Sequence, residues 1–315
     1  MFETPTPTPP SNETTSLTCP GCGAVVDVDA GHASAVCVYC ATPGVVARPR
    51  KTGAPRPALL VPFVVGKDEA TKAVKQWQRS RSIFAHGGVK HASIEVMRGV
   101  YVPAWLYSCV ARSGYTARIG EDYQETETYT TTEDGKTVRR TRTVTKTEWH
   151  TLEGDHAQYV ADVIVTASRG VPNDELERVE PFDLRGLRRR DDQALVGWLV
   201  EEASLDSTAG LNMAREETSG VIRRALSSFL PGDSHSDLHF NTHFDRESLD
   251  LLLVPLWVLA VRYDPQKPAL RLLVNGTNKK VAGATPWSAP KIAAAIIVVC
   301  VVVALVAVVF YRGPR

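Results

Sequence analysis

The chain has 315 residues, 43% of them apolar, so it is long enough to form two or more compact units. Its 36 basic and 35 acidic side chains leave a formal net charge of +1, which excludes a general electrostatic attraction to nucleic acid. Four of the six cysteines lie in two CxxC clips, and the other two are Cys109 and Cys300.

The N-terminal segment, residues 1–17, alternates threonine and proline, and we expect it to be an extended, disordered tail. It contains Glu3 and Glu13 but no lysine, no arginine and no apolar run. A secretory signal peptide needs a basic start and an apolar stretch. We therefore expect no export by that route.

The next segment, residues 18–42, carries the most specific motif of the chain. The clips Cys19-Pro-Gly-Cys22 and Cys37-Val-Tyr-Cys40 are separated by fourteen residues, a spacing typical of tetrahedral zinc sites. A redox dithiol or a disulfide is the alternative, but a redox dithiol needs only one CxxC. We predict a small zinc β-ribbon, with Gly23 at the positive φ that a metal knuckle often needs.

The predicted ribbon holds one Zn²⁺ with a structural role. A segment this short cannot bury a core of its own, so a metal would supply the folding free energy. Four thiolates close the coordination sphere and leave no position for a reactive water. The predicted metal ligands are Cys19, Cys22, Cys37 and Cys40.

A basic, proline-rich linker at residues 43–57 is expected to separate the ribbon from a larger, mainly antiparallel α+β domain at residues 58–286. In that domain LLVPFVV indicates a buried strand, and a helix capped by Asp68 is expected to follow. The apolar side chains that share one face of this helix are Ala70, Ala73, Val74 and Trp77.

Residues 93–111 and 115–131 indicate long strands, and YVADVIVTAS indicates another. Near residues 123–149, two polar arms joined by the turn EDGK predict a solvated, protruding β-hairpin. Glutamates on one arm of this hairpin can face arginines on the other.

A helical region is expected over residues 174–230, and its last helix begins near Ser207 and stops at Pro231-Gly232. Two strands, LLLVPLWVLAVRY and ALRLLVNG, follow. The apolar stripe predicted for the last helix contains Leu211, Ala214, Thr218, Val221, Ala225 and Phe229.

The C-terminal segment, residues 287–315, contains twenty uncharged, almost wholly apolar residues at 292–311, and Cys300 lies among them. As a helix this run would be about 30 Å long, the thickness of bilayer hydrocarbon. Interfacial anchors, Trp287 with Lys291 and Tyr311 with Arg312, flank it. A buried core helix is the alternative, but such helices seldom lack a polar face. We predict a single-pass tail anchor.

The orientation of this anchor cannot be taken from charge, because lysines and arginines nearly balance across it. The missing signal peptide and the need for reduced thiolates favour the cytoplasm for the bulk of the chain.

Two further patterns are candidate sites. His235, His239 and His243 would share one face of a helix as metal ligands could, but LHFNTHF alternates like a strand, so a solvated loop leading into a strand is favoured. Arg188-Arg189-Arg190 meets Asp191-Asp192, which favours a local ion-pair surface over a phosphate site.

Cys109 and four tryptophans lie in apolar surroundings. Cys109 has no activating partner in sequence and is expected to be a buried small residue. Core packing is likewise expected for Trp77, Trp105, Trp198 and Trp257.

Several short motifs, in this order, carry a resemblance to a known family. They are GVYVPAW (99–105), PFDL (181–184), LVGWLVEE (195–202), LVPLWV (253–258) and VNGTNKKVAG (274–283). With the double-CxxC ribbon and the terminal anchor, the chain from about residue 17 onward resembles bacterial zinc-ribbon membrane proteins. Members often carry primosomal-protein, helicase-like or transcription-factor-type labels, and their activity is unassigned. Lys279 stands where that family usually has a glycine.

The helicase label has no support in the sequence. A P-loop needs GxxxxGK[ST], and at Gly135-Lys136-Thr137 the first glycine is replaced by Thr130, in a hairpin turn. We also identify no nucleophile and base pair for a hydrolase, so we expect no enzyme activity.

Two functions remain. The first is a non-enzymatic, membrane-tethered interaction or scaffold protein that meets unidentified protein partners and the lipid bilayer. The second is a membrane-held nucleic-acid-binding ribbon, which is disfavoured because residues 1–47 contain acids but no lysine or arginine. Some relatives appear alongside membrane-stress proteins, so the resemblance implies a role in envelope stress.

Overall fold

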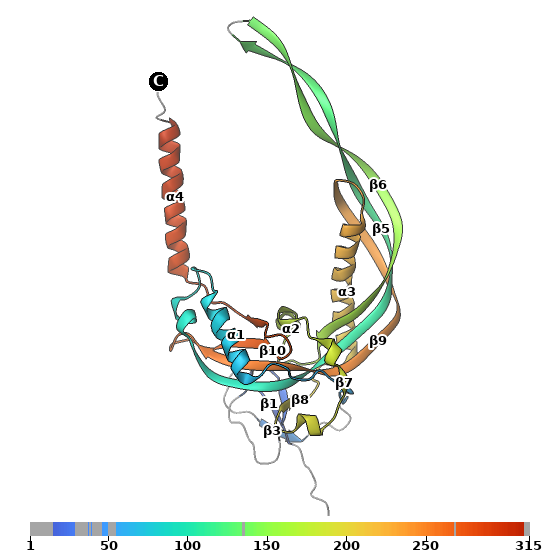
Figure 1. Cartoon of the computed structure of the whole chain (residues 1–315), viewed down its shortest axis with the longest axis vertical. Helices are drawn as coiled ribbons and strands as arrows, with labels where there is room; N and C mark the ends of the chain where they lie inside the picture. The colour runs from blue at the N-terminus through green and yellow to red at the C-terminus, as the bar shows by residue number, and fades with distance from the viewer. Residues whose placement is uncertain are drawn as a thin grey trace, which may run out of the picture. The chain divides into compact units, whose positions relative to one another are not determined.

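The computed structural model describes residues 15–28, 37, 39, 46–49, 55–133, 136–267 and 269–311. Over these residues the chain is an α+β protein with a C-terminal apolar helix, as predicted, and its sheet is mixed (Figure 1). It divides into two compact units. The first unit contains Met1–Trp105, Val165–Asp206 and Asp250–Arg315, and the second contains Leu106–Ile164 and Ser207–Leu249.

The sheet of the first unit runs in the order β11-β10-β9-β5-β8-β2-β1-β3. Two pairings, β4 with β9 and β5 with β8, are parallel, which makes the sheet mixed. The strands are β1 (Thr15–Thr18), β2 (Val25–Val28), β3 (Val46–Pro49), β4 (Leu59–Leu60), β5 (Ser93–Glu133), β7 (Arg188–Arg189), β8 (Leu199–Glu201), β9 (Ser234–Arg262), β10 (Leu270–Asn275) and β11 (Val281–Gly283).

The predicted ribbon segment joins this sheet through long-range pairing. β2 pairs antiparallel with β8, with Val26 opposite Glu201. β3 falls within the residues predicted as linker, yet it pairs with β1, with Ala47 opposite Leu17. Residues 1–14 of the predicted tail and residues 43–45 and 50–54 of the linker lie outside the described residues. The separation into ribbon, linker and α+β domain stays a prediction.

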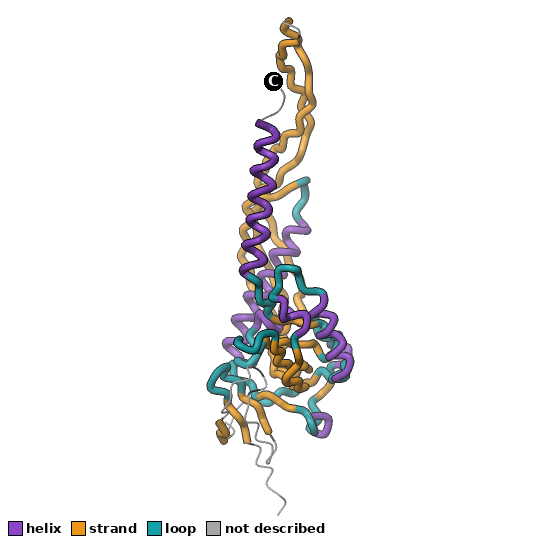
Figure 2. The backbone as a smooth tube through the Cα atoms, turned by 90° about the vertical axis from the view of Figure 1, so that its left-hand side faces the viewer, coloured by secondary structure: helices purple, strands orange, loops and turns teal. Residues whose placement is uncertain are grey.

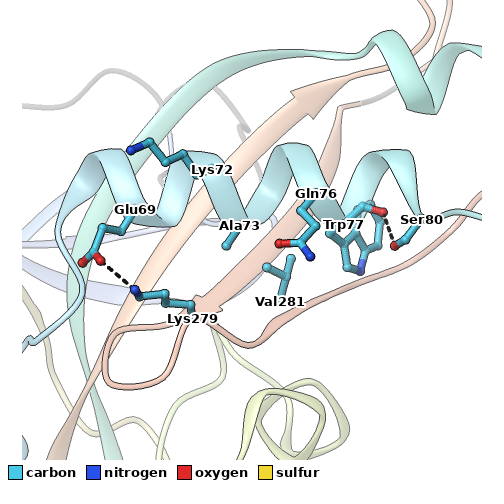
Figure 3. Close-up of a pocket in the computed structure, with 8 residues that line it drawn as sticks. All are labelled: Glu69, Lys72, Ala73, Gln76, Trp77, Ser80, Lys279 and Val281. Carbon is cyan, nitrogen blue, oxygen red and sulfur yellow. Dashed lines mark hydrogen bonds and ion pairs between the residues drawn. The ribbon is translucent and has the colours of Figure 1, made fainter.

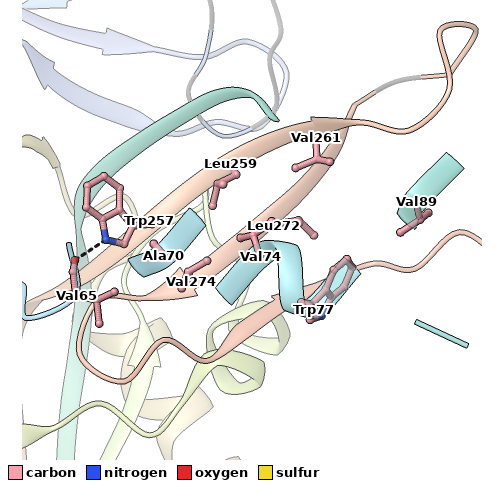
Figure 4. Packing of buried hydrophobic residues seen from close by; sticks show 10 residues of the cluster. All are labelled: Val65, Ala70, Val74, Trp77, Val89, Trp257, Leu259, Val261, Leu272 and Val274. Carbon is pink, nitrogen blue, oxygen red and sulfur yellow. Dashed lines mark hydrogen bonds between the residues drawn. The ribbon is translucent and has the colours of Figure 1, made fainter. Parts of the chain in front are cut away.

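Helix α1 (Lys67–Arg79) packs its apolar face on β9 and β10, as Figure 4 shows. The cap differs from the prediction: the N-cap is Gly66 and not Asp68, because the Glu69 carboxylate accepts a hydrogen bond from the Gly66 N–H and closes the first turn. The core at this contact consists of Val65, Ala70, Val74, Trp77, Val89, Trp257, Leu259, Val261, Leu272 and Val274.

The region predicted as helical over 174–230 is only partly so. Helix α2 (Asn173–Val179) stops at Glu180, which precedes Pro181, and proline disfavours helical backbone in the residue before it. Short 3-10 turns, η2 (Leu184–Gly186) and η3 (Gln193–Leu195), and the strands β7 and β8 fill the interval before α3 (Ser207–Phe229). Strand pairing with β4, β5 and β2 therefore replaces helix there.

In the second unit the predicted hairpin is confirmed, with β5 paired to β6 (Lys136–Thr166). The two predicted strands at 93–111 and 115–131 are one continuous strand, β5. Its outer arms wind around each other in both views (Figure 2). Cross-strand ion pairs, Lys146 Nζ to Glu125 Oε2 at 2.7 Å and Arg142 to Glu127 at 3.1 Å, match the predicted facing of charges.

Helix α3 packs through a different stripe from the one predicted. Its buried residues are Gly210, Ala214, Thr218, Ile222 and Leu226, whereas Phe229 is 57% exposed. A spacing of four advances slightly more than one turn each time, so the row inclines around the helix, as packing against twisted strands requires. Ala214 and Thr218 belong to both the predicted and the observed stripe.

The C-terminal helix α4 (Ala289–Tyr311) belongs to the first unit. Its residues Ala289–Ala307 form a run long and apolar enough to cross a membrane, and none of them is buried against the rest of the protein. Pro290 lies in its first turn, where proline is tolerated.

Candidate metal centre

The first CxxC clip forms a tight knuckle between β1 and β2. The Cys19 N–H donates to the Ala24 carbonyl at 2.9 Å, and the Gly23 N–H donates to the Cys19 carbonyl at 3.0 Å. Gly23 has a φ of +75°, as the motif predicts, and the Gly21 N–H donates to Cys19 Sγ at 3.3 Å. The backbone therefore turns sharply and brings the Gly21 N–H to the Cys19 sulfur.

The second clip brings a third sulfur to the same place. Cys37 Sγ lies 3.7 Å from Cys22 Sγ, and all three sulfurs of Cys19, Cys22 and Cys37 lie within 4.8 Å of one another. The Tyr39 N–H donates to Cys37 Sγ at 3.4 Å, the counterpart of the bond from Gly21 in the first clip. Three of the four predicted ligands thus form a cluster that could bind a metal ion.

The spacing of these sulfurs is compatible with a bound metal ion and is too long for a disulfide bond between Cys22 and Cys37. A disulfide bond is about 2.05 Å long, far shorter than the 3.7 Å between Cys22 and Cys37. A zinc ion with bonds of about 2.3 Å to tetrahedral thiolates would hold neighbouring sulfurs about 3.8 Å apart. Cys40 lies outside the described residues, so its part as fourth ligand stays a prediction.

A buried carboxyl group ties the second clip to the sheet. The Tyr39 hydroxyl donates to Glu201 Oε2 at 2.6 Å, and the Ser168 hydroxyl donates to Glu201 Oε1 at 2.5 Å. Burial raises the pKa of Glu201 to about 7, against which the two hydroxyl hydrogen bonds act. This network fixes Tyr39, two residues after Cys37, to β8 and to the loop after β6.

No local sequence motif predicts that Glu201, Ser168 and Gly170 meet here. A Cβ at Gly170 would lie 2.7 Å from Ala24 Cβ, so the backbone there approaches the first knuckle closely. The sequence contains one signal for this network, the adjacent glutamates Glu201-Glu202 at the end of an apolar strand. Because glutamates are seldom buried unless they are partnered, their place beside apolar residues indicates a partner elsewhere in the chain.

The histidines weighed as metal ligands do not converge. His235, His239 and His243 lie exposed along β9, which begins at Ser234; the predicted strand is present, but it also contains His235, where a solvated loop was expected. His243 Nε2 lies 3.1 Å from Asp245 Oδ1. Over the described part of the chain, the three clip cysteines are the one group of three or more His, Cys, Asp or Glu side chains with ligand atoms this close.

The remaining candidates have structural explanations. Arg190 pairs with Asp192 at 2.8 Å, as the predicted ion-pair surface requires. Lys136 begins β6, so the GKT sequence follows a strand and leads into a strand, although Gly135 is outside the described residues. Cys109 is fully buried, and three of the four tryptophans, Trp77, Trp105 and Trp257, are at most 9% exposed.

An open groove of about 460 Å³ lies between α1 and the β10–β11 turn (Figure 3). Lys279 Nζ crosses it to Glu69 Oε1 at 2.6 Å, and the groove also contains Trp77 and Val281. Lys279 has a φ of +68°, so it adopts the left-handed conformation that a glycine would supply at this position. The turn therefore keeps a glycine-like geometry despite the lysine.

Comparison with known proteins gives a distant relative but no family. No family model and no solved structure matches the chain. The uncharacterized protein YdjG of Bacillus subtilis (strain 168) is 24% identical over 247 residues, which cover 78% of this chain and 68% of YdjG. The name of this relative states no activity, so the likeness transfers none.

Proposed function

We propose that the chain is a non-enzymatic, membrane-tethered zinc-ribbon protein that presents interaction surfaces at the cytoplasmic face. The observation that carries this proposal is the exposure of α4. Its apolar run at Ala289–Ala307 has no buried residue, and so much exposed apolar surface would be unfavourable in water. Trp287, which is 61% exposed and lies two residues before the helix begins, has the amphipathic ring that favours a membrane interface.

The metal part of the proposal rests on the cysteine cluster. One structural zinc ion held by Cys19, Cys22, Cys37 and Cys40 would neutralise thiolates, two of which, those of Cys19 and Cys37, are at least 94% buried. The ion would join the two clips and so fix β1 and β2, which β8 extends into the larger sheet. Its role is to hold this surface together.

The interaction part rests on the same arrangement and on the resemblance to bacterial zinc-ribbon membrane proteins. A closed four-thiolate site offers no catalytic position, whereas the exposed hairpin β5–β6 and the ribbon are surfaces that other proteins can meet. We place the bulk of the chain in the cytoplasm because thiolates stay reduced there. A role in envelope stress follows the family resemblance.

The membrane part is tested by extraction of the full chain. We expect it to fractionate with membranes and to resist carbonate and high salt, and we expect a chain that ends before Pro290 to become soluble. Full-length chain in the soluble fraction would contradict the anchor. A tag at the N-terminus should be protected from protease in intact cells, and its cleavage would reverse the orientation.

The interaction part is tested by proximity labelling in the native host. We expect neighbours that depend on the ribbon, namely a set labelled by the full chain but lost in a Cys19→Ser, Cys37→Ser chain that still fractionates with membranes. An identical set of neighbours for both chains would contradict a ribbon that recruits partners.

A further inference from the structure

The loop formed by residues 82–86, between α1 and η1 (Gly87–His91), is bound to the start of α4. The Ser288 N–H donates to the Phe84 carbonyl at 2.8 Å, and the His86 N–H donates to the Pro286 carbonyl at 2.8 Å. Ala85 and Trp287 form an antiparallel bridge between these bonds. These bonds therefore fix the position of the 82–86 loop relative to the first turn of α4.

Lys291 completes this attachment from within α4. Its ammonium group donates to the carbonyls of Ile83 at 3.1 Å and Ala85 at 3.0 Å. The Phe84 and Ala85 N–H groups donate to the hydroxyl and the carbonyl of Ser82. From Phe84 to His86 each backbone N–H thus has a partner, and from Ser82 to Ala85 each carbonyl has one.

Two large apolar side chains, one in this loop and one just before α4, are open to solvent. Ile83 is 72% exposed and Trp287 is 61% exposed. Beside them lies a groove of about 420 Å³, whose lining consists of Phe84, Trp287, Ile292, Ala295, Ile296, Val299 and Cys300. This apolar surface continues without a break into the exposed apolar run of α4.

We propose that the 82–86 loop, Trp287 and the groove at the base of α4 form a lipid-binding surface that lies in the boundary between headgroups and acyl chains. The inference rests on the proposed membrane span and adds a second element that enters the bilayer. The occupant is lipid, because this apolar surface is continuous with the proposed span and because the Ser82–Ala85 carbonyls and the Phe84–His86 N–H groups are paired, as backbone at the edge of the hydrocarbon requires.

Lys291 has a second part in this arrangement. Lysine at the end of a membrane span keeps its ammonium group at the interface while its aliphatic stem lies along apolar surface. Here the ammonium group also binds the loop carbonyls, so it is the positioning residue that holds Ile83 and Phe84 at the depth of the headgroups.

The test is photo-crosslinking of the full chain in vesicles of phosphatidylethanolamine and phosphatidylglycerol. The photoreactive p-benzoylphenylalanine replaces Ile83, Val196 or Val302 in separate chains. Val196 is the matched control, because it is 79% exposed in a loop of the same unit, and Val302 reports the span itself. Mass spectrometry measures the yield of lipid adducts.

We expect a lipid yield at position 83 close to that at 302 and several-fold above that at 196. We also expect Lys291→Met to lower the yield at 83 and to leave the yield at 302 unchanged. Adducts at 302 with no excess at 83 over 196, or adducts at 83 to protein instead of lipid, would overturn the lipid-binding surface and leave the anchor standing. No adducts at 302 would overturn the proposed span and this inference with it.

Discussion

At the scale of single residues, the clip cysteines would need a cation if they are ionised, because two of them are buried. Buried thiolates need a cation, and Cys19 and Cys37 are 2% and 6% exposed. We expect the purified full chain to carry one zinc ion, and we expect Cys19→Ser with Cys37→Ser to lose it. Metal analysis of freshly purified protein measures the zinc content.

The matched control for this prediction is Cys109→Ser. Cys109 is buried, as Cys19 and Cys37 are, but it belongs to the second unit and is not a member of the cluster. It should keep the full zinc content. Sub-stoichiometric zinc in the unaltered chain, together with a disulfide between the clips, would contradict the metal centre.

Glu247 supplies a second prediction at this scale. Its carboxylate on β9 accepts hydrogen bonds from Arg215 Nε on α3 at 2.8 Å and from the Tyr107 hydroxyl on β5 at 2.5 Å. The Arg215 hydrogen bonds hold the pKa of Glu247 below its ordinary value. The second unit is therefore stabilised when Glu247 is ionised, and this contribution is present above the ordinary glutamate pKa.

We expect Glu247→Gln to lower the free energy of unfolding near pH 7 by about 1–3 kcal/mol, the range for hydrogen bonds to charged groups. As pH falls through the lowered pKa, Glu247 is protonated and the difference should shrink. Denaturant titrations at several pH values measure it. Glu153→Gln, an exposed glutamate of the same unit, is the control. A difference that is constant with pH would contradict the argument.

At the scale of elements, β5 contains a glycine, Gly99, at a position where the Trp198 ring leaves no space for a side chain. A Cβ at Gly99 would lie 2.3 Å from the Trp198 ring. That ring cannot retreat easily, because it stacks on Phe63 at a centroid distance of 4.1 Å. We expect Gly99→Ala to lower the free energy of unfolding by about 1–3 kcal/mol, as overpacking does.

The matched change is Gly114→Ala in the same strand. There the nearest atom to a new Cβ is Asp155 Oδ1 at 3.5 Å, an ordinary contact. This alanine should be neutral or slightly stabilising, because it reduces the freedom of the unfolded chain. Thermal unfolding of the two variants compares them. Equal effects would show that Trp198 can move aside.

Local patterns predicted the elements whose neighbours in space are also neighbours in sequence. The buried positions of α1 follow the helical period, and the β5–β6 hairpin follows two alternating arms around a short turn. The prediction of helix for the interval between α2 and α3 was wrong, because the strands β7 and β8 form there by pairing with distant segments. Propensity within a window carries no information about such partners.

The candidate site divides in the same way. CxxC spacing predicted that Cys19, Cys22 and Cys37 would meet, since each clip is a local turn. Tyr39 and Glu201 are 162 residues apart in the sequence, so no local pattern could predict their contact. A buried carboxylate becomes recognisable only when the sheet order places β8 beside β2.

At the scale of the whole molecule, charge separates the proposed scaffold from a nucleic-acid reader. The chain has a net charge of +1, and residues 1–47 hold acids but no lysine or arginine. Four thiolates around one Zn²⁺ would add further negative charge to the ribbon. Affinity for phosphate backbones comes mainly from basic side chains that release counterions, so the ribbon lacks the charges a reader needs.

We therefore expect the full chain to bind duplex or single-stranded DNA and RNA no more tightly than about 10⁻⁴ M at physiological salt, the weak end of non-specific binding. Fluorescence anisotropy over a series of salt concentrations measures this. Any residual affinity should come from the basic segment after the ribbon. It should vanish when Arg48, Arg50, Lys51 and Arg56 become glutamine, and should survive Cys19→Ser with Cys37→Ser. Micromolar binding that is lost in the cysteine variant and retained in the glutamine variant would instead make the ribbon a membrane-held nucleic-acid reader.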